Sequence, residues 1–316
     1  MRSAVSSARA RLQPLDVTLR HSRGYQWVRR LVLTTSVALT LLLPVWHLAA
    51  LRHASAGVSG AGAFDVAAGL PFTAAPPIVG GAGAIRVFGL ELVDPLAVGS
   101  VMLSNGPSTT LLWALLPGLV LVLLLGRFFC GWICPYLPVL AASNATRWLL
   151  GRLGFHLPDL RLPRSTAYVV LGAVPVLSAW LGVQVLPLIY PPSVIGREAF
   201  NALYFGGLGA GALVVLGAFG FDTFVSRAGF CRTLCPGGAA FSALGALSPI
   251  TVKRKVEACT DCTVCDVVCN LGQLPMTSRL DQGCERCGRC VSSCPTKALS
   301  FGLGKPALLR SQKEKP

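Results

Sequence analysis

Residues 111–125 read LLWALLPGLVLVLLL, and residues 128–135 follow as FFCGWICP. The first stretch carries no charge, and a helix needs about 20 mainly apolar residues to cross the hydrocarbon core of a bilayer. The whole chain is similar in character, with 53% hydrophobic and 13% charged residues among 316 and a mean hydropathy of +0.62. Soluble domains carry about 25% charged residues. The composition therefore indicates a membrane protein and excludes a disordered chain.

Four apolar stretches are long enough, or nearly so, to span a membrane as helices. They cover residues 31–51, 109–128, 167–190 and 201–221. We therefore predict an α-helical membrane protein, with a four-helix transmembrane bundle in residues 31–250, an outer loop at 52–108 and a cytoplasmic segment at 1–30. The A-x-A pattern at Ala54–Ala56 resembles a signal-peptide cleavage site. The first apolar run exceeds the roughly 7 to 15 residues of a signal peptide, which favours a retained anchor.

The distribution of positive charge predicts the orientation of these spans, because cytoplasmic loops carry an excess of Lys and Arg. Of 28 such residues, seven lie before residue 31, five in 127–166 and thirteen from Arg227 onward. Both termini and the loop between the second and third spans are therefore expected in the cytoplasm. The net charge of +15 is explained by topology, and we predict no nucleic-acid partner because no DNA-binding motif accompanies it.

Eight of the 12 cysteines form two consecutive C-x2-C-x2-C-x3-C motifs near the C-terminus. They are Cys259, Cys262, Cys265 and Cys269, followed by Cys284, Cys287, Cys290 and Cys294. Two such copies are typical of a bacterial ferredoxin with two [4Fe-4S] clusters. Thiols on the cytoplasmic side stay reduced, so we do not expect structural disulfides.

In this motif the fourth cysteine of each copy ligates the other cluster. The sequence thus predicts cluster one on Cys259, Cys262, Cys265 and Cys294, and cluster two on Cys284, Cys287, Cys290 and Cys269. The second copy ends in Cys-Pro295, but the first has Asn270 where proline is usual. Zinc is the alternative metal, although its four-cysteine sites use two C-x2-C pairs separated by a longer loop. We predict an α+β ferredoxin-like module at 251–303, held together by its clusters, and a basic tail at 304–316.

The remaining four cysteines form two C-x3-C-P motifs, Cys130 to Pro135 and Cys231 to Pro236. A spacing of four residues puts both sulfurs of a pair on one helical face, and proline marks where a helix stops or kinks. Similar flanking residues indicate a duplicated unit: Phe129 and Phe230 precede the pairs, and Arg127 and Arg227 lie upstream. Three interpretations of Cys130, Cys134, Cys231 and Cys235 stay open, namely metal ligands, redox thiols or packed helix ends.

The four predicted spans, the segments FFCGWICP and GFCRTLCP, and the tandem cysteine motifs occur in one order. In this combination the chain resembles the NapH/MauN family of ferredoxin-type membrane proteins, to which NosR and CcoG are related. The resemblance implies a multi-pass protein of the bacterial inner membrane, in contact with lipid and the quinone pool. It further implies an electron-transfer subunit of a quinol dehydrogenase complex. Electrons would pass from quinol toward a periplasmic reductase or dehydrogenase system through an iron–sulfur or c-type cytochrome partner.

A quinol site needs an acid or a histidine to take protons. The candidates near the predicted outer face are His47, His53, Glu91, Asp94 and Glu198, and His47 is the strongest because it lies within an apolar run. Two other functions stay open. In the first, the chain is an iron–sulfur assembly or maturation factor that reduces a metal or thiol for another redox enzyme. In the second, it is a membrane redox sensor, for which no output domain is visible.

Overall fold

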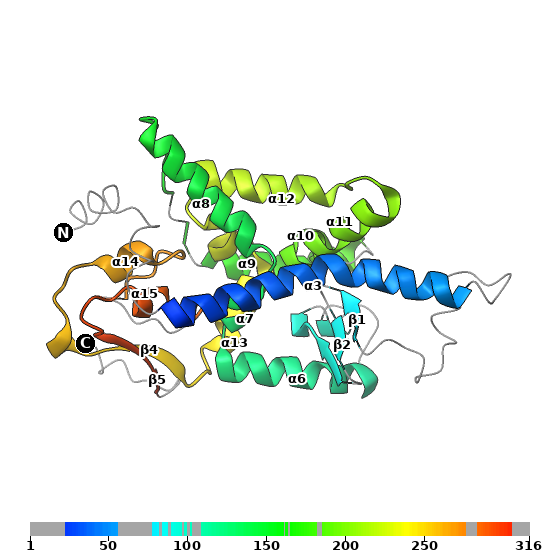
Figure 1. The fold of residues 1–316 in the computed structure, drawn as a ribbon, viewed down its shortest axis with the longest axis horizontal. Helices are drawn as coiled ribbons and strands as arrows, with labels where there is room; N and C mark the ends of the chain where they lie inside the picture. Colours follow the sequence, from blue (N-terminus) through cyan, green and yellow to red (C-terminus); the bar gives the residue numbers. More distant parts are fainter. Residues whose placement is uncertain are drawn as a thin grey trace. The chain divides into compact units, whose positions relative to one another are not determined.

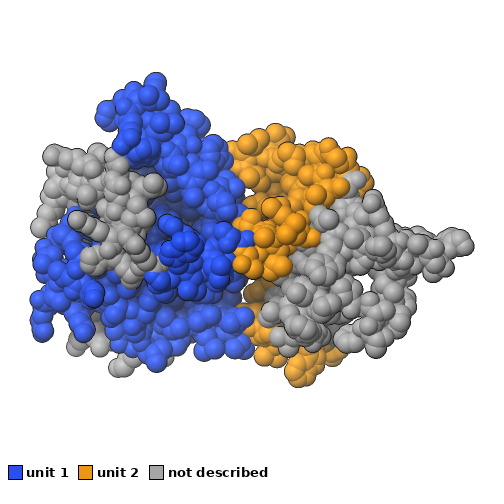
Figure 2. Space-filling model, viewed as in Figure 1, with its two compact units in different colours: residues 1–34, 120–173, 218–316 blue, residues 35–119, 174–217 orange. Residues whose placement is uncertain are grey.

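The computed structural model describes residues 23–55, 78–81, 84–87, 90–96, 98–99, 102, 109–160, 162–163, 165–181, 185–275 and 283–304. The chain divides into two compact units, which Figure 2 colours separately. Unit 1 comprises Met1–Thr34, Val120–Ala173 and Ala218–Pro316, and unit 2 comprises Thr35–Leu119 and Val174–Gly217. All twelve cysteines belong to unit 1.

The described elements are mainly helical (Figure 1). The helices are α3 (Arg23–Ser55), α6 (Thr109–Leu125), α7 (Phe128–Trp132), α8 (Leu137–Arg152), α9 (Ser165–Leu181), α10 (Leu186–Ile189), α11 (Pro191–Phe205), α12 (Gly211–Gly220), α13 (Pro236–Gly245), α14 (Val264–Val268) and α15 (Arg289–Ser292). Two π-helical turns, η1 (Phe221–Val225) and η2 (Phe230–Leu234), and one 3-10 turn, η3 (Val256–Ala258), accompany them.

The predicted four-helix transmembrane bundle is wrong. Within the described ranges, no helix combines the length and the apolar character that a membrane crossing requires. α6 and α9 have 17 residues each, which at 1.5 Å per residue extend about 26 Å, short of a core of about 30 Å. The stretch predicted at 201–221 is divided where Gly206 ends α11 with φ +68°. The prediction of which loops face the cytoplasm and which face outward depended on these four spans.

The physical reason is that apolar sequence does not by itself keep a helix continuous. Gly126, directly after α6, has φ +60°, a left-handed conformation that ends a right-handed helix. The predicted first span, 31–51, lies within the 33 residues of α3. From residue 43 onward the side chains of α3 are outside the described residues.

Unit 2 contains a three-stranded antiparallel sheet in the region predicted as an outer loop. Strands β1 (Ile78–Gly81), β2 (Ala84–Val87) and β3 (Leu90–Val93) pair in sequence order. The register places Ile78 opposite Val87 and Ala84 opposite Val93. Strands that follow one another along the chain are neighbours in the sheet, as in a simple meander.

In unit 1, a two-stranded sheet brackets both ferredoxin-type motifs. Strand β4 (Ile250–Arg254) precedes the first cysteine and β5 (Leu299–Leu303) follows the last, and they pair antiparallel (Figure 1). The core beside this sheet is small. Its buried members are Val268, Cys290, Cys294, Ala298 and Leu299. Two of these five are cysteines, so the core depends on the state of its thiols.

Candidate iron–sulfur sites

One pocket of unit 1 gathers four cysteines from both ferredoxin-type motifs. Its cysteines are Cys259, Cys262, Cys265 and Cys294. The pocket opens at the surface, since the Cys262 side chain is exposed. A cation lies beside it: Arg254 Nη1 is 3.9 Å from Cys259 Sγ and 3.6 Å from Asp261 Oδ1. Pro295 also lines this pocket.

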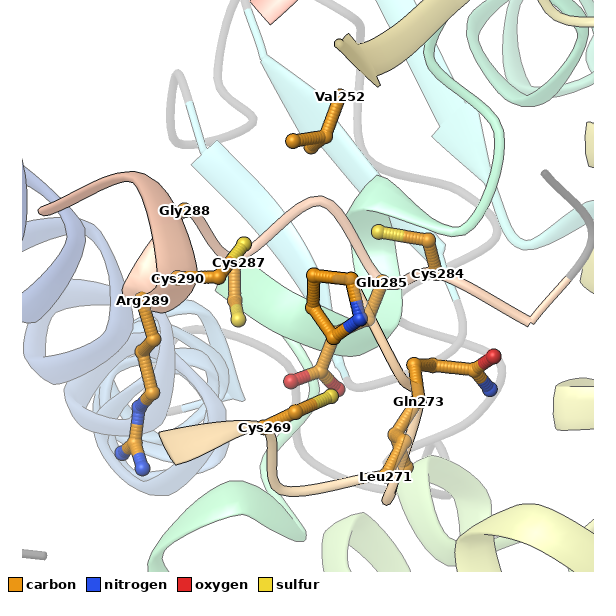
Figure 3. A pocket seen from close by; sticks show the side chains of 11 residues that line it. Val252, Cys269, Leu271, Gln273, Cys284, Glu285, Cys287, Gly288, Arg289 and Cys290 are labelled. Atoms are coloured by element: carbon orange, nitrogen blue, oxygen red, sulfur yellow. The ribbon is translucent and has the colours of Figure 1, made fainter. Parts of the chain in front are cut away.

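A second pocket gathers the other four cysteines, and Figure 3 shows it from close by. Its cysteines are Cys269, Cys284, Cys287 and Cys290. In the view, Cys284 lies across the pocket from Cys287 and Cys290, and Cys269 lies below them. The two pockets therefore divide the eight cysteines in the same crossed manner as the ligand sets expected from the spacing.

The donor chemistry of both pockets suits a [4Fe-4S] cluster, which is held by four cysteine thiolates. Among the described residues, no three His, Cys, Asp or Glu side chains converge on a point where a single ion could be held. A cubane distributes its four thiolates over four irons, so its ligands surround a volume and do not meet at one point. Four thiols around each pocket match that requirement.

Burial opposes the ionisation of five of these thiols, Cys265, Cys269, Cys284, Cys287 and Cys290. Burial is the largest cause that raises the pKa of Cys265, Cys284 and Cys287 to about 12 and that of Cys269 to about 11. Thiols must lose their protons to act as ligands, so cluster binding would release protons from these sites. The energy of metal binding then contributes directly to the folding of the module.

Both motifs repeat their backbone as well as their cysteines. The second residue after the first cysteine has a positive φ in each copy, +50° at Asp261 and +51° at Arg286. The residue after the second cysteine is also left-handed, with φ +59° at Thr263 and +67° at Gly288. Thr263 and Gly288 are the N-cap residues of the short helices that follow, α14 and α15. Non-glycine residues rarely adopt such angles, so their recurrence identifies two equivalent ligand loops.

Asn270, which replaces the usual proline of the first motif, has a structural role. Its side chain is buried, and its Oδ1 accepts a hydrogen bond of 2.7 Å from Arg289 Nη1. Arg289 lines the second cysteine pocket, which Cys269 also lines. Asn270 therefore holds a cation beside the second set of cysteines, which a proline side chain could not do.

The two C-x3-C-P motifs share one turn geometry. The backbone N–H of Cys134 donates to Phe129 O at 3.0 Å, and that of Cys235 donates to Phe230 O at 2.8 Å. Both bonds span five residues, as in a π-helical turn. The expected single helical face is only partly present, because α7 ends before Cys134 and η2 ends before Cys235. The shared bond supports the predicted duplicated unit.

The four cysteines of these motifs lie close enough to interact electrostatically. Burial is the main cause that raises the pKa of Cys231, and the charges of Asp222, Cys235, Cys134 and Cys130 raise it further. Aromatic rings pack the motifs together, with Phe129 and Phe241 centroids 5.8 Å apart and Tyr136 and Phe230 centroids 5.4 Å apart.

Arg127 joins the two motifs from a buried position. Its Nη1 donates to Ser242 Oγ at 3.0 Å and its Nη2 donates to Cys231 O at 3.3 Å. Gly238 makes this approach possible, because a Cβ there would lie 2.6 Å from Cys231 O and 3.1 Å from Arg127 Nη2. From the sequence, Arg127 was predicted only as a sign of duplication, and its role in joining the two motifs was not predicted.

The ligand loop of the second pocket packs directly on the first C-x3-C-P motif. The indole N–H of Trp132 donates to Arg286 O at 3.1 Å, and a Cβ on Gly131 would collide with Glu285 O. Arg286 continues the contact, since its Nε donates to Ile250 O at 2.9 Å. No spacing signal marks Arg286 in advance, because any residue can stand between the cysteines of C-x2-C.

Two of the residues considered for a quinol site, Glu198 and Asp94, have described side chains, and each has hydrogen-bond partners of its own. Glu198 is buried in unit 2, where its carboxylate accepts from the amides of Gly209 and Gly211, the latter at 3.1 Å. Asp94 accepts a hydrogen bond of 2.6 Å from Tyr190 Oη. These are structural roles, at the start of α12 and near the end of α10. The side chains of His47, His53 and Glu91 lie outside the described residues.

Comparison with known proteins identifies the family. A family model described as a 4Fe-4S binding domain matches the chain over residues 106–156 and 208–255. The ferredoxin-type protein NapH of Escherichia coli K12 is 34% identical over 220 residues, which cover 65% of this chain and 72% of that protein. The chain belongs to the NapH and MauN family of ferredoxin-type proteins. This confirms the resemblance that the motifs predicted.

Other relatives agree with this assignment. NapH of Haemophilus influenzae is 29% identical over 232 residues, covering 69% of this chain and 78% of its own length. The methylamine utilization ferredoxin-type protein MauN of Methylorubrum extorquens is 35% identical over 183 residues, covering 57% of this chain and 61% of its own length. No solved structure is significantly similar to the chain.

Membership in the NapH and MauN family makes this chain a ferredoxin-type iron–sulfur protein of electron transfer. The two matches to the iron–sulfur domain each contain one C-x3-C-P motif. The eight cysteines from Cys259 to Cys294 follow the second match. The family model of the 4Fe-4S binding domain therefore matches the segments that contain the C-x3-C-P motifs.

Proposed function

We propose that this chain holds two [4Fe-4S] clusters in crossed ligand sets, one on Cys259, Cys262, Cys265 and Cys294 and one on Cys284, Cys287, Cys290 and Cys269. The observation that carries the proposal is the division of these cysteines between two pockets, each lined by four of them. Such a cluster, when bound, accepts or releases one electron. Two clusters then allow the chain to exchange two electrons with a quinol in single steps.

The protein around each pocket is suited to stabilise thiolate ligands. The backbone N–H of Arg286 donates to Cys284 Sγ at 3.4 Å, and that of Ala298 donates to Cys294 Sγ at 3.3 Å. Hydrogen bonds to sulfur are one of the factors that set the potential of a cluster. Arg289, held by Asn270, adds positive charge near the second pocket, which favours the reduced state there.

Exposure separates the roles of the two pockets. The first pocket includes an exposed cysteine, Cys262, whereas none of the four cysteines in the second pocket is exposed. The second ligand loop also packs on α7 through Trp132 and Arg286. The first pocket is therefore the one that a soluble redox partner reaches, and the second faces the C-x3-C-P motifs. Iron–sulfur or c-type cytochrome subunits are the partners that we propose.

Membrane quinol is the electron donor that we propose, at the bacterial inner membrane. The family supports this donor, and exposed apolar side chains in unit 2 support contact with lipid. Trp180 is 80% exposed, Trp113 75% and Leu213 71%. Large exposed apolar side chains are typical of surfaces that bind membranes or proteins. The chain would then act as the electron-transfer subunit of a quinol dehydrogenase complex.

The test is an anaerobic exchange of electrons between the purified protein with its clusters and a water-soluble quinol analogue. Cluster absorbance and paramagnetic signals report reduction, and oxidised quinone added to reduced protein tests the reverse direction. Exchange in either direction is expected. A Cys130→Ala variant with both ferredoxin-type clusters intact tests whether the C-x3-C-P motif takes part, because slower exchange with unchanged iron content would place it on the path.

Intact clusters that exchange no electrons with quinone, with or without a partner subunit, would contradict the proposal. In that case deletion of the protein should be compared with the wild type for the metal content of the redox enzyme that it serves. An immature enzyme, deficient in metal, would favour the maturation function over electron supply.

A further inference from the structure

A third cavity in unit 1 lies outside both cysteine pockets. Its volume is about 70 Å³. The residues that line it are Arg127, Ala167, Tyr168, Arg232, Gly238, Ala239, Ser242, Gln273 and Gly283. They come from both C-x3-C-P segments, from the start of α9 and from the chain between the two ferredoxin-type motifs. Neither the sequence motifs nor the proposed electron transfer accounts for it.

The charged lining of this cavity consists of two arginines. Arg127 and Arg232 contribute guanidinium groups, which only donate. Ser242 Oγ and Gln273 Nε2 also lie in the lining, where they donate to Gly238 O at 2.7 Å and to Gly283 O at 3.3 Å. Among the described lining residues, none carries a carboxylate. Two guanidinium groups therefore share a small cavity whose described lining has no carboxylate. Such a cavity favours an anionic ligand with several hydrogen-bond acceptors.

Arg127 shows that this donor capacity is not fully used within the protein. The residue is 4% exposed, and its two Nη atoms donate to Ser242 and Cys231. Its Nε is buried and has no hydrogen-bond partner among the described residues. Cys130 and then Glu285 attract Arg127 electrostatically, but neither residue lines the cavity. A buried donor without a partner is destabilising, and an acceptor within its reach would remove that penalty.

The volume selects among ligands rich in acceptors. An engineered cavity of about 150 Å³ holds a benzene molecule. A quinone head is larger than benzene, so a cavity of about 70 Å³ is too small for it. A compact oxyanion of a few heavy atoms fits, and arginine pairs recognise phosphate oxygens with their planar forks.

We propose that this cavity binds a phosphate-type oxyanion, either free phosphate or the headgroup of an anionic phospholipid. Bound there, the anion links both C-x3-C-P segments to the chain that follows Cys269. Gln273 lines this cavity and the second cysteine pocket, so the anion adds negative charge beside the second cluster site. Negative charge next to a cluster lowers its reduction potential.

The experiment measures binding directly and involves no electron transfer, so its result is independent of the proposed function. The full chain with its clusters is titrated anaerobically with inorganic phosphate by calorimetry, in a chloride buffer free of other oxyanions. We expect saturable binding at one site. Arg232→Gln should weaken binding at least tenfold, because it removes charge-assisted hydrogen bonds to the anion.

Two further variants separate a specific site from general charge effects and from loss of folding. Arg152→Gln removes one positive charge from an exposed arginine that lies over the Trp148 ring, 4.0 Å from its centroid, and should leave binding unchanged. Arg232→Lys keeps the charge but not the planar fork, so its affinity should lie between those of the wild type and Arg232→Gln.

Vesicles distinguish the two sources of phosphate. Flotation is compared between phosphatidylcholine vesicles and vesicles that also contain phosphatidylglycerol. If phosphatidylglycerol increases vesicle binding, and Arg232→Gln reduces this increase while Arg152→Gln retains it, the ligand is the lipid headgroup. If calorimetry shows phosphate binding but phosphatidylglycerol does not increase vesicle binding, the ligand is free phosphate. The proposal is overturned if wild type shows neither, or if Arg232→Gln binds as tightly as wild type in both assays.

Discussion

At the scale of single residues, Asp222 connects the duplicated halves of unit 1. The residue is fully buried, and its Oδ1 accepts from Phe230 N at 2.8 Å while its Oδ2 accepts from Tyr136 Oη at 2.9 Å. Tyr136 directly follows the first C-x3-C-P motif, and Phe230 directly precedes the first cysteine of the second. Burial is the largest cause that raises the pKa of Asp222, to about 6 from an ordinary 3.8.

This pKa makes stability depend on pH with a defined sign. Between pH 4 and 6 the folded state holds a proton that the unfolded state has lost, so the free energy of unfolding falls as pH rises through this window. The shift corresponds to about 3 kcal/mol. Asp222→Asn should flatten the part of this slope seen in thermal unfolding between pH 5 and 7. Glu257→Gln, which changes an exposed acidic side chain, is the control and should keep the slope. Equal slopes in Asp222→Asn and wild type would refute the assignment of this pH dependence to Asp222.

Crossed ligation predicts which cysteine variants resemble each other. Cys269→Ala should lose the same cluster as Cys284→Ala, whereas Cys294→Ala should lose the same cluster as Cys259→Ala. The paramagnetic spectrum of the remaining cluster identifies which one is present, and iron content should fall in all four variants. If Cys269→Ala instead resembles Cys259→Ala, each motif ligates its own cluster and the crossed arrangement is wrong.

At the scale of elements, the contact between α7 and the second ligand loop links the two types of cysteine motif. The short helix provides Trp132 as a donor to Arg286 O, and Arg29 of α3 donates to Gly131 O at 2.8 Å. The approach is close enough that Gly131 has no room for a side chain against Glu285 O. A glycine that packs against backbone has no flexible neighbour to move aside.

Gly131→Ala should therefore destabilise unit 1 by about 1 to 3 kcal/mol, the usual cost of overpacking. The measurement is the denaturant midpoint of wild type and variant, with cluster absorbance as a second signal. Gly172→Ala is the matched control, because Gly172 lies within α9 with nothing within 4 Å of an added Cβ. Alanine there should stabilise the helix by roughly 0.5 to 1 kcal/mol. Equal midpoints for both variants would show that the contact with Glu285 is not tight.

At the scale of the whole molecule, the two units differ in what holds them together. The module between β4 and β5 has a small core that includes Cys290 and Cys294, with Cys259, Cys265 and Cys284 packed against it. Such a core is too small to be stable without its ligands. Unit 2 contains none of the cysteines, and its three strands are held by backbone pairing.

Removal of iron with a chelator should consequently unfold one part and spare the other. Hydrogen exchange at β4 and β5 should accelerate to the rate of unprotected amides, because metal binding supplies the folding energy of the module. The paired strands β1 to β3 should keep their protection. Unchanged exchange at β4 and β5 after complete loss of iron would contradict a core that depends on clusters.

Local patterns were enough to predict a candidate site, because ligand spacing is a local property. The C-x2-C-x2-C-x3-C motifs predicted two groups of four cysteines, and two pockets are lined by those groups. The C-x3-C-P motifs and their order predicted the family, which comparison confirmed. The role of Asn270 was not predicted, since its partner Arg289 lies 19 residues away in the sequence.

The sequence by itself determined the cysteine motifs, the family and the apolar character of the helices, because each of these is a property of short stretches of chain. Only the tertiary structure decided where the helices end and which distant side chains meet. Backbone breaks at Gly126 and Gly206 interrupt stretches that hydropathy alone treats as continuous. Arg127 meets Ser242 across 115 residues of sequence. The donor-lined cavity exists because folding brings such distant side chains together, and no pattern in one stretch can encode that contact.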